Sequence, residues 1–336
     1  MGMGSLLSRR KWERAGVAVV ALCAALTACQ PQPRGDDGQT TIGAIVFQED
    51  QYFRLIQQGM QDVAARLDVE LMVHNSFGTL DKEISIIDTY LANHVDALVV
   101  APLSPQSSIP ALKRAHDKGI PVITYDAHVD ADFPASNIRS DQVELGRVTG
   151  EAARVFIEAK LGGKAKVAIV QYIALAPETA SQRVKGFKDE VTKLPGVEIV
   201  TEQDAWLAPE ATSLVENMLT ANPAIDVIWA ANEGGTVGAV NAATAANKKN
   251  TNHHVHVFGT DMSEQIGSFL LSEEDVLQAV TGQKPFDIGA QAITTALAVV
   301  KNEPVEQKVA LPGILFSRND APATQAYMAK LKELSQ

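Results

Sequence analysis

From Thr41 onward, short apolar runs alternate with longer stretches in which apolar residues recur every three to four positions. Runs of four to eight apolar residues are typical of buried strands, and the longer amphipathic stretches are typical of helices. The first series of predicted strands spans residues 42–47, 70–75, 97–100, 122–125 and 136–139. The second spans residues 166–171, 198–201, 227–230, 255–259 and 277–281.

The predicted helices lie between these strands, at residues 53–67, 82–93, 109–118, 145–159, 183–193, 211–221 and 236–246. Uninterrupted apolar strands that alternate with helices indicate parallel sheets covered on both faces. Two such series predict an α/β fold with two doubly wound parallel-sheet lobes that meet near Ser140 and Asp141. A helix at 287–300 and a strand near 307–311 fit either lobe by pattern alone.

The segment before this body has the organisation of an export signal. Four basic residues (Arg9, Arg10, Lys11 and Arg14) precede an uncharged stretch at 15–28, and small residues lead to Cys29. The stretch is shorter than the roughly 20 residues of a membrane-spanning helix, so it predicts a secretory signal. We therefore expect the protein to work outside the cytoplasm, in the periplasm or cell envelope.

The sequence Leu26-Thr-Ala-Cys29 resembles the lipobox of bacterial lipoproteins. That resemblance implies cleavage before Cys29 and a lipid anchor on its new N-terminus. The alternative is an ordinary signal peptide, residues 1–29, with an incidental cysteine. Residues 30–40, rich in proline, glycine and polar residues, predict a flexible linker of the kind that a tethered domain needs.

Charge and cysteine usage narrow the range of partners. The chain carries a formal charge of −11, and the signal contributes +3 (four basic residues and Glu13), which leaves −14 on the rest. Such an acidic body argues against nucleic acid as a partner, because nucleic-acid binding relies on basic patches. The second cysteine, Cys23, lies inside the signal, so the exported body has no disulfide and depends on its core.

Ligands of open parallel sheets bind beyond the carboxyl ends of the strands. The residues expected there are Phe47 to Phe53, Asp126, Ser140, Gln171, Trp206, Asn232, Asp261 and Gln283. Carboxylates and carboxamides can hold neighbouring hydroxyls, and aromatic rings pack on the C–H faces of a sugar ring. This combination, without a strong nucleophile, favours polyol recognition over catalysis. No cofactor is expected.

These segments together resemble the ribose- and galactose-binding proteins, the type I periplasmic family that supplies sugars to ABC importers. The similarity covers residues 41–308. It is carried by Ile42-Gly-Ala-Ile-Val46, Gln51-Tyr-Phe53, Gly119-Ile-Pro-Val-Ile-Thr-Tyr-Asp126, Gln182-Arg-Val-Lys-Gly-Phe187, Trp229-Ala-Ala-Asn232-Glu233, Val257-Phe-Gly-Thr-Asp261 and Ala279-Val-Thr-Gly-Gln283.

The resemblance implies a three-strand hinge, with crossings near residues 140–142, 282–284 and 311–314. The N-terminal lobe would comprise residues 41–140 plus 284–311, and the C-terminal lobe residues 141–283 plus 312–336. It also implies a ligand site. The implied ligand-binding residues are Asp50 or Gln51 (a one-residue gap leaves the register open), Tyr52, Phe53, Asp126, Ser140, Ser181, Trp206, Asn232, Asp261 and Gln283.

Three positions depart from the family pattern. Ala127 and Ser181 stand where ribose-type proteins have arginines, and Ala101 stands where asparagine can occur. The loss of two bidentate donors argues against ribose and for a larger or differently substituted ligand.

Several residues also have structural interpretations. Asp126 and Asp261 could cap the helices after their strands, and Trp206 could pack between the lobes. Tyr52 or Phe53 could fasten its helix to the core, and Arg183 could form a structural ion pair.

The histidines at 253, 254 and 256 lack the convergent partners of a zinc site, so a solvated loop, and no metal, is expected there.

The sequence therefore predicts a monomeric, non-catalytic solute-binding protein that takes a monosaccharide or polyol and delivers it to an ABC permease. Two alternatives stay open. One is a sensory module that signals to a membrane receptor or histidine kinase, and the other is an enzyme on the same scaffold. Related DNA-binding repressors are excluded because an export signal replaces their DNA-binding helices.

Overall fold

The computed structural model describes residues 39–334. The predicted signal, Cys29 and nearly all of the predicted linker lie outside the described residues. Every element described below belongs to one compact unit, Thr40–Gln336. Within residues 39–334, each helix is too short or too polar to cross a bilayer.

The first sheet has six strands in the order β11-β5-β4-β3-β1-β2, and all neighbouring pairs are parallel. Its strands are β1 (Thr41–Val46), β2 (Glu70–Asn75), β3 (Ala97–Val100), β4 (Val122–Tyr125), β5 (Ser136–Ser140) and β11 (Lys308–Leu311). Its helices are α1 (Gln51–Arg66), α2 (Leu80–Ala92), α3 (Ile109–Asp117) and α9 (Pro285–Val300). We call this sheet and its helices the first lobe.

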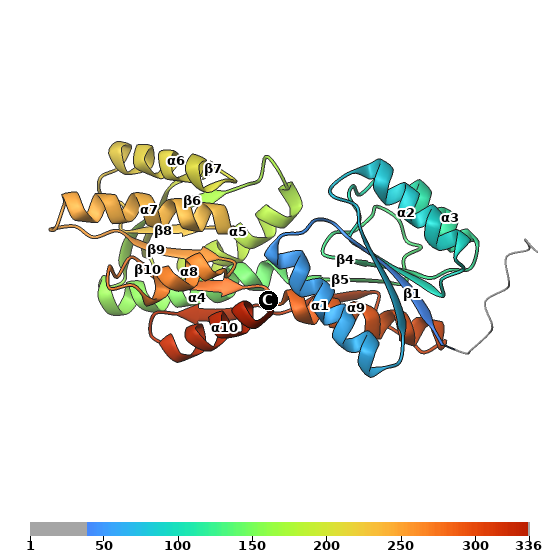
Figure 1. The fold of residues 1–336 in the computed structure, drawn as a ribbon. Coiled ribbons are helices and arrows are strands. Elements are labelled where there is room, and N and C mark those ends of the chain that lie inside the picture. The colour runs from blue at the N-terminus through green and yellow to red at the C-terminus, as the bar shows by residue number, and fades with distance from the viewer. Residues whose placement is uncertain (1–38, 335–336) are drawn as a thin grey trace, which may run out of the picture. The chain divides into compact units, whose positions relative to one another are not determined.

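Apolar residues on both faces of these strands explain the helices on each side. Ala44 faces the cluster formed with α1 and α9, whereas its neighbour Ile45 faces the cluster formed with α2 and α3. Val99 and Val100 of β3 divide in the same way. Figure 1 shows α1 and α9 on one side of the sheet and α2 and α3 on the other. Successive residues of a strand point to opposite faces, so a continuous apolar run needs cover on both.

The second sheet has the order β12-β10-β9-β8-β6-β7, with only β12 antiparallel to its neighbour. Its strands are β6 (Lys164–Gln171), β7 (Gly196–Asp204), β8 (Val227–Ala230), β9 (His256–Thr260), β10 (Leu277–Gly282) and β12 (Ile314–Ser317). Its helices are α4 (Gln142–Lys160), α5 (Pro177–Val191), α6 (Ala208–Ala221), α7 (Glu233–Lys249), α8 (Glu264–Leu271) and α10 (Ala321–Leu334). This is the second lobe. Clusters with α4 and α5 on one face and α6, α7 and α8 on the other form its core.

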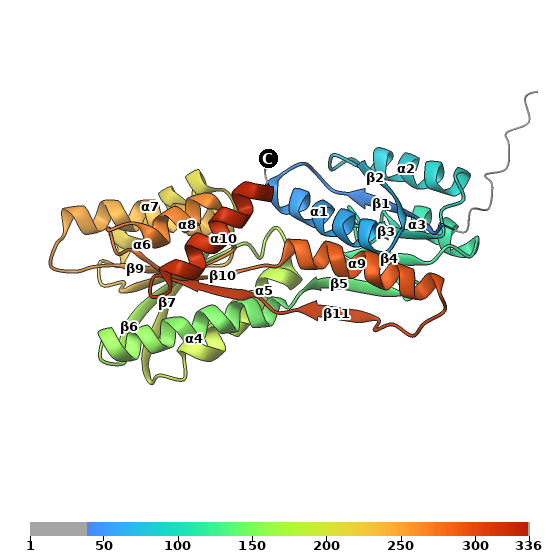
Figure 2. The same cartoon turned by 60° about the horizontal axis from the view of Figure 1, so that its bottom comes forward.

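The chain passes between the two sheets three times. It leaves the first lobe after β5, returns between β10 and α9, and leaves again between β11 and β12. Figure 2 shows β11 beside β5, with the chain continuing from it into the second lobe. The fold class predicted from the sequence, two doubly wound lobes joined by three connections, is confirmed. The residue limits given above for the lobes stay a prediction.

Two glycines let α4 and α5 pack closely. A Cβ added to Gly146 would lie 1.9 Å from the carbonyl oxygen of Arg183, and one added to Gly186 would lie 2.0 Å from that of Val143. Side chains at these positions would force the helices apart. The close approach fixes the position of Arg183 relative to the start of α4.

Sequence patterns missed α8, β12 and α10, and shifted the start of α4. The prediction began α4 at residue 145, but the helix begins at Gln142 because Asp141 is its N-cap and accepts a 2.9 Å hydrogen bond from the amide of Glu144. The missed elements are short or weakly amphipathic, and β12 owes its strand form to pairing with β10.

Candidate functional site

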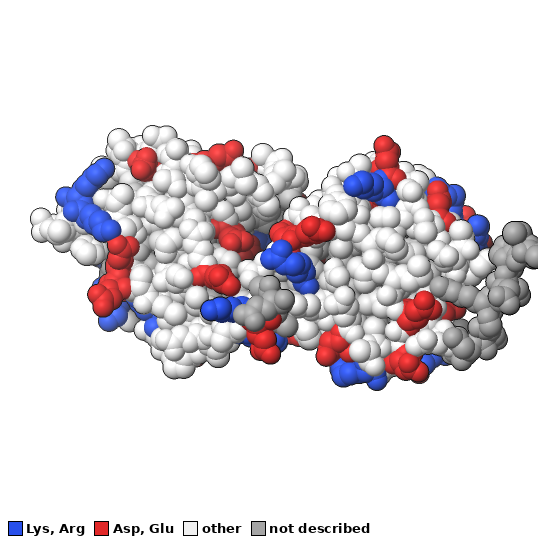
Figure 3. All heavy atoms as spheres, in the orientation of Figure 1, with Lys and Arg blue, Asp and Glu red and all other residues white. Residues whose placement is uncertain are grey.

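A cavity of about 1240 Å³ lies between the lobes, at the carboxyl ends of their strands. Figure 3 shows the surface hollowed between the lobes. Small-molecule pockets usually enclose roughly 300–1,000 Å³, so this cavity leaves room for the lobes to approach a bound ligand. Most of the predicted site residues line it: Asp50, Gln51, Tyr52, Phe53, Asp126, Trp206, Asn232, Asp261 and Gln283.

Two predicted site residues do not line the cavity. Ser140 is buried behind Gln283 and donates a 2.8 Å hydrogen bond from its hydroxyl to Oε1 of that residue. Ser181 lies on the exposed side of α5. The structure therefore gives Ser140 a supporting position and places Ser181 apart from the cavity.

Asp126 follows β4 directly and its backbone is in the left-handed region, with φ of 61°. Tyr52 reaches it from α1 and donates a 2.7 Å hydrogen bond from its hydroxyl to Oδ1. The next element after Asp126 is the strand β5 rather than a helix, so Asp126 does not cap a following helix. Aspartate and asparagine tolerate this backbone region better than most residues, which suits them to this turn.

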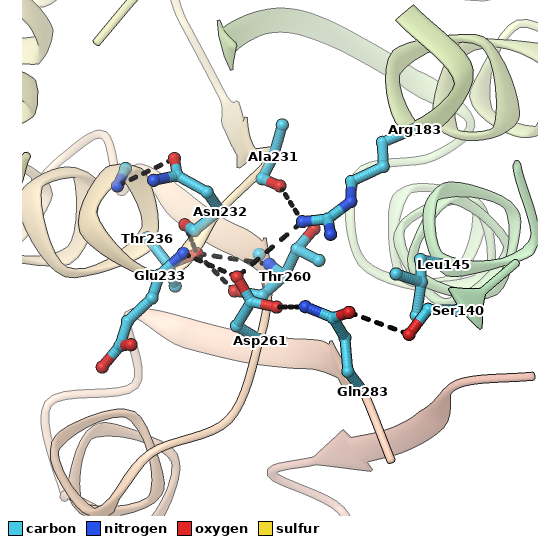
Figure 4. A network of polar contacts seen from close by, with 12 residues as sticks. Ser140, Leu145, Arg183, Ala231, Asn232, Glu233, Thr236, Thr260, Asp261 and Gln283 are labelled. Atoms are coloured by element: carbon cyan, nitrogen blue, oxygen red, sulfur yellow. Dashed lines mark hydrogen bonds and ion pairs between the residues drawn. The ribbon is translucent and has the colours of Figure 1, made fainter. Parts of the chain in front are cut away.

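Asp261 occupies the corresponding place after β9, with φ of 73°. Its Oδ1 accepts a 2.8 Å hydrogen bond from Nε2 of Gln283, and its Oδ2 accepts one of 3.0 Å from the amide of Glu233 (Figure 4). The cap of the following helix α8 is Ser263, not Asp261. Asp261 instead stabilises the N-terminus of α7, where a carboxylate is favourable.

Arg183 of α5 lies beneath the cavity with only 5% of its surface exposed. Its Nε donates a 2.6 Å hydrogen bond to Oε1 of Gln142, and its Nη1 donates one of 2.8 Å to the carbonyl of Ala231. The same Nη1 lies 3.8 Å from Oδ2 of Asp261. The ion pair considered for Arg183 is therefore present, and its partner is a predicted site residue.

Asn232 is the N-cap of α7 and is 4% exposed. Its Oδ1 accepts a 3.2 Å hydrogen bond from the amide of Gly235, while its Nδ2 donates one of 2.9 Å to the carbonyl of Trp206. The side chain thus joins the start of α7 to the segment that carries Trp206. One amide hydrogen and one lone pair are left for a ligand.

Aromatic rings approach the cavity from both lobes. Tyr52 and Phe53 meet edge to face with centroids 5.3 Å apart, but Phe53 is only 7% exposed and belongs to the first-lobe core. In the second lobe Trp206 is 44% exposed and its ring lies 5.0 Å from that of Tyr172. Phe53 therefore fastens α1 to the core, whereas Trp206 presents free ring surface to the cavity.

Asp50 begins the α1 side of the site. Asp50 is the N-cap of α1. Its Oδ1 accepts a 3.0 Å hydrogen bond from the amide of Phe53, and its Oδ2 accepts one from the side chain of Gln48. Gln51 is the first residue of the helix and also lines the cavity. The cap sets where Tyr52 emerges from the turn.

Burial raises the pKa of several ionisable groups at the cavity, among them Asp126, Glu233 and Tyr52. It raises the pKa of Asp126 above the ordinary 3.8, although the Tyr52 hydrogen bond and the charge of Arg183 act against this shift. Burial also raises the pKa of Glu233. The pKa of Tyr52 is raised well above its usual value, first by burial and then by the negative charge of Asp126.

Residues 44–304 match the family model of the periplasmic binding protein domain. The chain belongs to this family. It is 29% identical over 283 residues to the ABC transporter periplasmic-binding protein YphF of Escherichia coli, covering 82% of this chain and 85% of the relative. It is 30% identical over 292 residues to a putative rhizopine-binding protein of Rhizobium meliloti, covering 83% and 90%.

Among solved structures, an ABC transporter solute-binding protein of Actinobacillus succinogenes with bound D-allose superimposes on this periplasmic binding protein with a TM-score of 0.73. The two are 25% identical over 85% of this chain and 100% of that one. The family resemblance predicted from the sequence is confirmed by these comparisons.

The cavity of this periplasmic binding protein also contains residues that sequence reasoning did not identify. Tyr172 directly follows β6, so the strand-end rule could have found it. His128, Arg139 and Glu178 also line it, and Arg139 directly precedes the predicted site residue Ser140 at the end of β5. Nη1 of Arg139 in the first lobe lies 3.7 Å from Oε1 of Glu178 in the second, and Nε2 of His128 lies 3.8 Å from its Oε2. Such pairs exist only once the lobes are assembled.

Within residues 39–334, no group of three or more histidine, cysteine, aspartate or glutamate side chains is arranged to hold a metal ion. His256 is the first residue of β9 rather than part of the preceding loop, and the ring of His253 contacts the carbonyl of Ile225 at 2.9 Å.

Proposed function

We propose that this protein captures a monosaccharide or polyol between its two lobes and delivers it to an ABC importer. One observation carries the proposal: carboxylates and carboxamides from both lobes converge on a single cavity that also has exposed aromatic surface. Hydroxyl groups need both acceptors and donors, and Asp126, Asp261 and Gln283 supply them. A relative named as an ABC transporter periplasmic-binding protein and a solute-binding protein with bound D-allose support it.

The proposed site has a contacting set and a supporting set. Asp126, Asp261 and Gln283 would bind ligand hydroxyls, with Asp50 and Gln51 at the edge of the cavity, and Tyr52 and Trp206 would contact the ring. Phe53, Ser140 and Asn232 are buried and would mainly hold these residues in place, since Ser140 bonds the side chain of Gln283 and Asn232 bonds the backbone of Trp206. Ser181 is left out of the proposed site.

The proposed mechanism is closure around the ligand. Asp126 comes from the first lobe and Asp261 from the second, so a ligand that binds both stabilises the closed arrangement relative to the open one. The three connections at 140–142, 282–284 and 311–314 would act as the hinge. Transport needs no reacting group, and proteins of this family bind substrates without transforming them.

A thermal-shift screen of the purified protein against pentoses, hexoses, polyols and their amino derivatives tests the proposal. A bound ligand should raise the melting temperature with its concentration, by an amount set by the ratio of concentration to Kd. The proposal fails if none of these compounds raises the melting temperature. A new product after prolonged incubation would replace it with an enzymatic function.

We also propose that Cys29 is lipidated and tethers a monomeric protein to the cell envelope, where the anchor would raise its effective concentration near the permease. Growth with a labelled fatty acid should label the wild-type protein and leave Cys29→Ser unlabelled. Equal labelling of both would contradict the lipid anchor. Light scattering of the purified protein should give the mass of one chain, and a dimer mass would contradict the monomer.

A further inference from the structure

Asp126 and Asp261 occupy equivalent positions in the two lobes but differ in their surroundings. Each follows a central parallel strand and each has a positive φ, 61° and 73°. Both line the same cavity. The two residues have matching backbone positions, so they differ chiefly in the charged groups and hydrogen-bond donors that surround each carboxylate.

Asp261 is well compensated. Its two oxygens accept hydrogen bonds from Nε2 of Gln283 and from the amide of Glu233, at 2.8 and 3.0 Å. Arg183 lies 3.8 Å away and supplies a positive charge. Figure 4 shows the side chains of Arg183 and Gln283 both directed toward Asp261.

Asp126 has much less compensation. The hydroxyl of Tyr52 donates to Oδ1, and the structure records no hydrogen bond to Oδ2 and no cation within 4.0 Å of either oxygen among residues 39–334. The residue that follows it, Ala127, brings no charge. The cation that acts on Asp126 is Arg183, which is engaged by Asp261, Gln142 and the carbonyl of Ala231.

The other charged groups near Asp126 do not compensate it. Asp261 and Asp50 both act on it with the same sign of charge, and both favour protonation of its carboxyl group. His128, two residues further along, is directed toward Asp130 and Glu178. A ligand that closes the cavity would remove more water from Asp126, and a desolvated carboxylate without a countercharge is unfavourable.

We propose that the natural ligand is a sugar or polyol carrying a protonated amino group, and that Asp126 pairs with this group. The inference rests on the proposed function and narrows its ligand class. An ammonium group would supply a hydrogen-bond donor to the unpaired Oδ2 of Asp126 and, at the same time, the positive charge that this carboxylate lacks nearby. Asp261, already paired, would bind hydroxyls.

Matched ligands test this inference. Calorimetric Kd values are compared for D-glucosamine with D-glucose, D-galactosamine with D-galactose, and glucamine with sorbitol. N-Acetyl-D-glucosamine serves as a neutral control of larger size. Where a pair binds, the amine should bind about tenfold more tightly than its hydroxyl counterpart, since charge-assisted hydrogen bonds are roughly twice as strong as neutral ones.

Two variants locate the effect. Asp126→Asn keeps the shape, the left-handed backbone preference and an acceptor for Tyr52, and should abolish the preference for amines. Glu233→Gln removes one charge from another cavity residue whose pKa is also raised, and should keep most of the preference. An equal loss of amine preference in both variants would mean that the overall negative charge of the cavity, and not Asp126 itself, selects the amine.

The pH dependence gives an independent readout. Only ionised Asp126 pairs with an ammonium group, so amine binding should weaken as the pH falls through the raised pKa of Asp126, and it should release protons in that range. Binding of neutral sugars with equal or higher affinity than amines would overturn the inference and leave the proposed function intact. If neither class binds, the proposed function itself fails.

Discussion

The hydroxyl of Tyr52 donates a 2.7 Å hydrogen bond to Oδ1 of Asp126, and this contact joins the first turn of α1 to the end of β4. The same hydroxyl lies 3.3 Å from Oε1 of Gln283, at the crossing between the lobes. Tyr52 therefore links Asp126 of the first lobe to Gln283, which lies at a crossing between the lobes. It is both a ring surface for a ligand and the only protein donor recorded for the Asp126 carboxylate within residues 39–334.

Replacing Tyr52 with phenylalanine should lower the free energy of unfolding by about 1–2 kcal/mol, because the substitution removes a hydrogen bond to a charged group. Urea denaturation at neutral pH measures the change. Tyr172→Phe is a matched control, since Tyr172 lines the same cavity and no hydrogen bond of its hydroxyl is recorded within residues 39–334. Similar losses in both variants would show that the Tyr52 contact adds no specific stability.

Asp126→Asn should change how stability depends on pH. The pKa of Asp126 is higher in the folded protein than the ordinary 3.8, so the folded state binds the proton more tightly than the unfolded chain. The contribution of this carboxyl group is fully present below pH 3.8 and is lost as the pH rises through the raised pKa. Asparagine has no such loss.

In the unliganded protein at neutral pH, Asp126→Asn should therefore raise the melting temperature by about 2 °C, a gain that disappears at low pH. Melting curves of both proteins across the acid range measure this difference. A constant difference at all pH values would show that the charge of Asp126 is not the cause.

Gly146→Ala should destabilise the second lobe by about 2–3 kcal/mol, because the new methyl group would meet the carbonyl of Arg183 where α4 and α5 pack. The separation of the helices should also displace Arg183 and weaken ligand binding. Glu158→Ala, on the exposed side of α4, is the control and should change stability by less than about 0.5 kcal/mol. Unchanged stability in the glycine variant would mean that the helices adjust without cost.

Trp206→Ala should remove the ligand-induced thermal shift while changing the melting temperature of the free protein by no more than a few degrees. The indole ring is 44% exposed and its recorded ring contact is with Tyr172, so its removal opens little core. Phe77 is an aromatic residue outside the cavity and is 53% exposed, so Phe77→Ala should leave the shift intact. A ligand shift that survives in Trp206→Ala would exclude ring stacking on this residue.

Asp261 shows how the structure alters expectations drawn from sequence. A residue that only contacts ligand could be replaced without loss of stability in the free protein. Asp261, however, also accepts hydrogen bonds from Gln283 and from the N-terminus of α7. Asn232 is similar: the sequence predicts that it binds ligand, and the structure shows that its side chain also caps the N-terminus of α7. The sequence placed both residues at strand ends, but their partners Gln283, Glu233 and Trp206 come from other segments, 22 to 28 residues away along the chain.

The sequence by itself determined the two-lobed architecture, since runs such as Leu98–Val100 are apolar at every position and require helices on both faces of a sheet. It also determined that Asp126, Trp206 and Asp261 follow strands, and so lie at the carboxyl edges of the sheets, where the cavity is. Only the tertiary structure decided that Arg183 forms its ion pair with Asp261 and not with Asp126. The reason is physical: hydrophobic periodicity is local to each segment, whereas charge compensation depends on separations of a few ångströms between side chains that folding brings together.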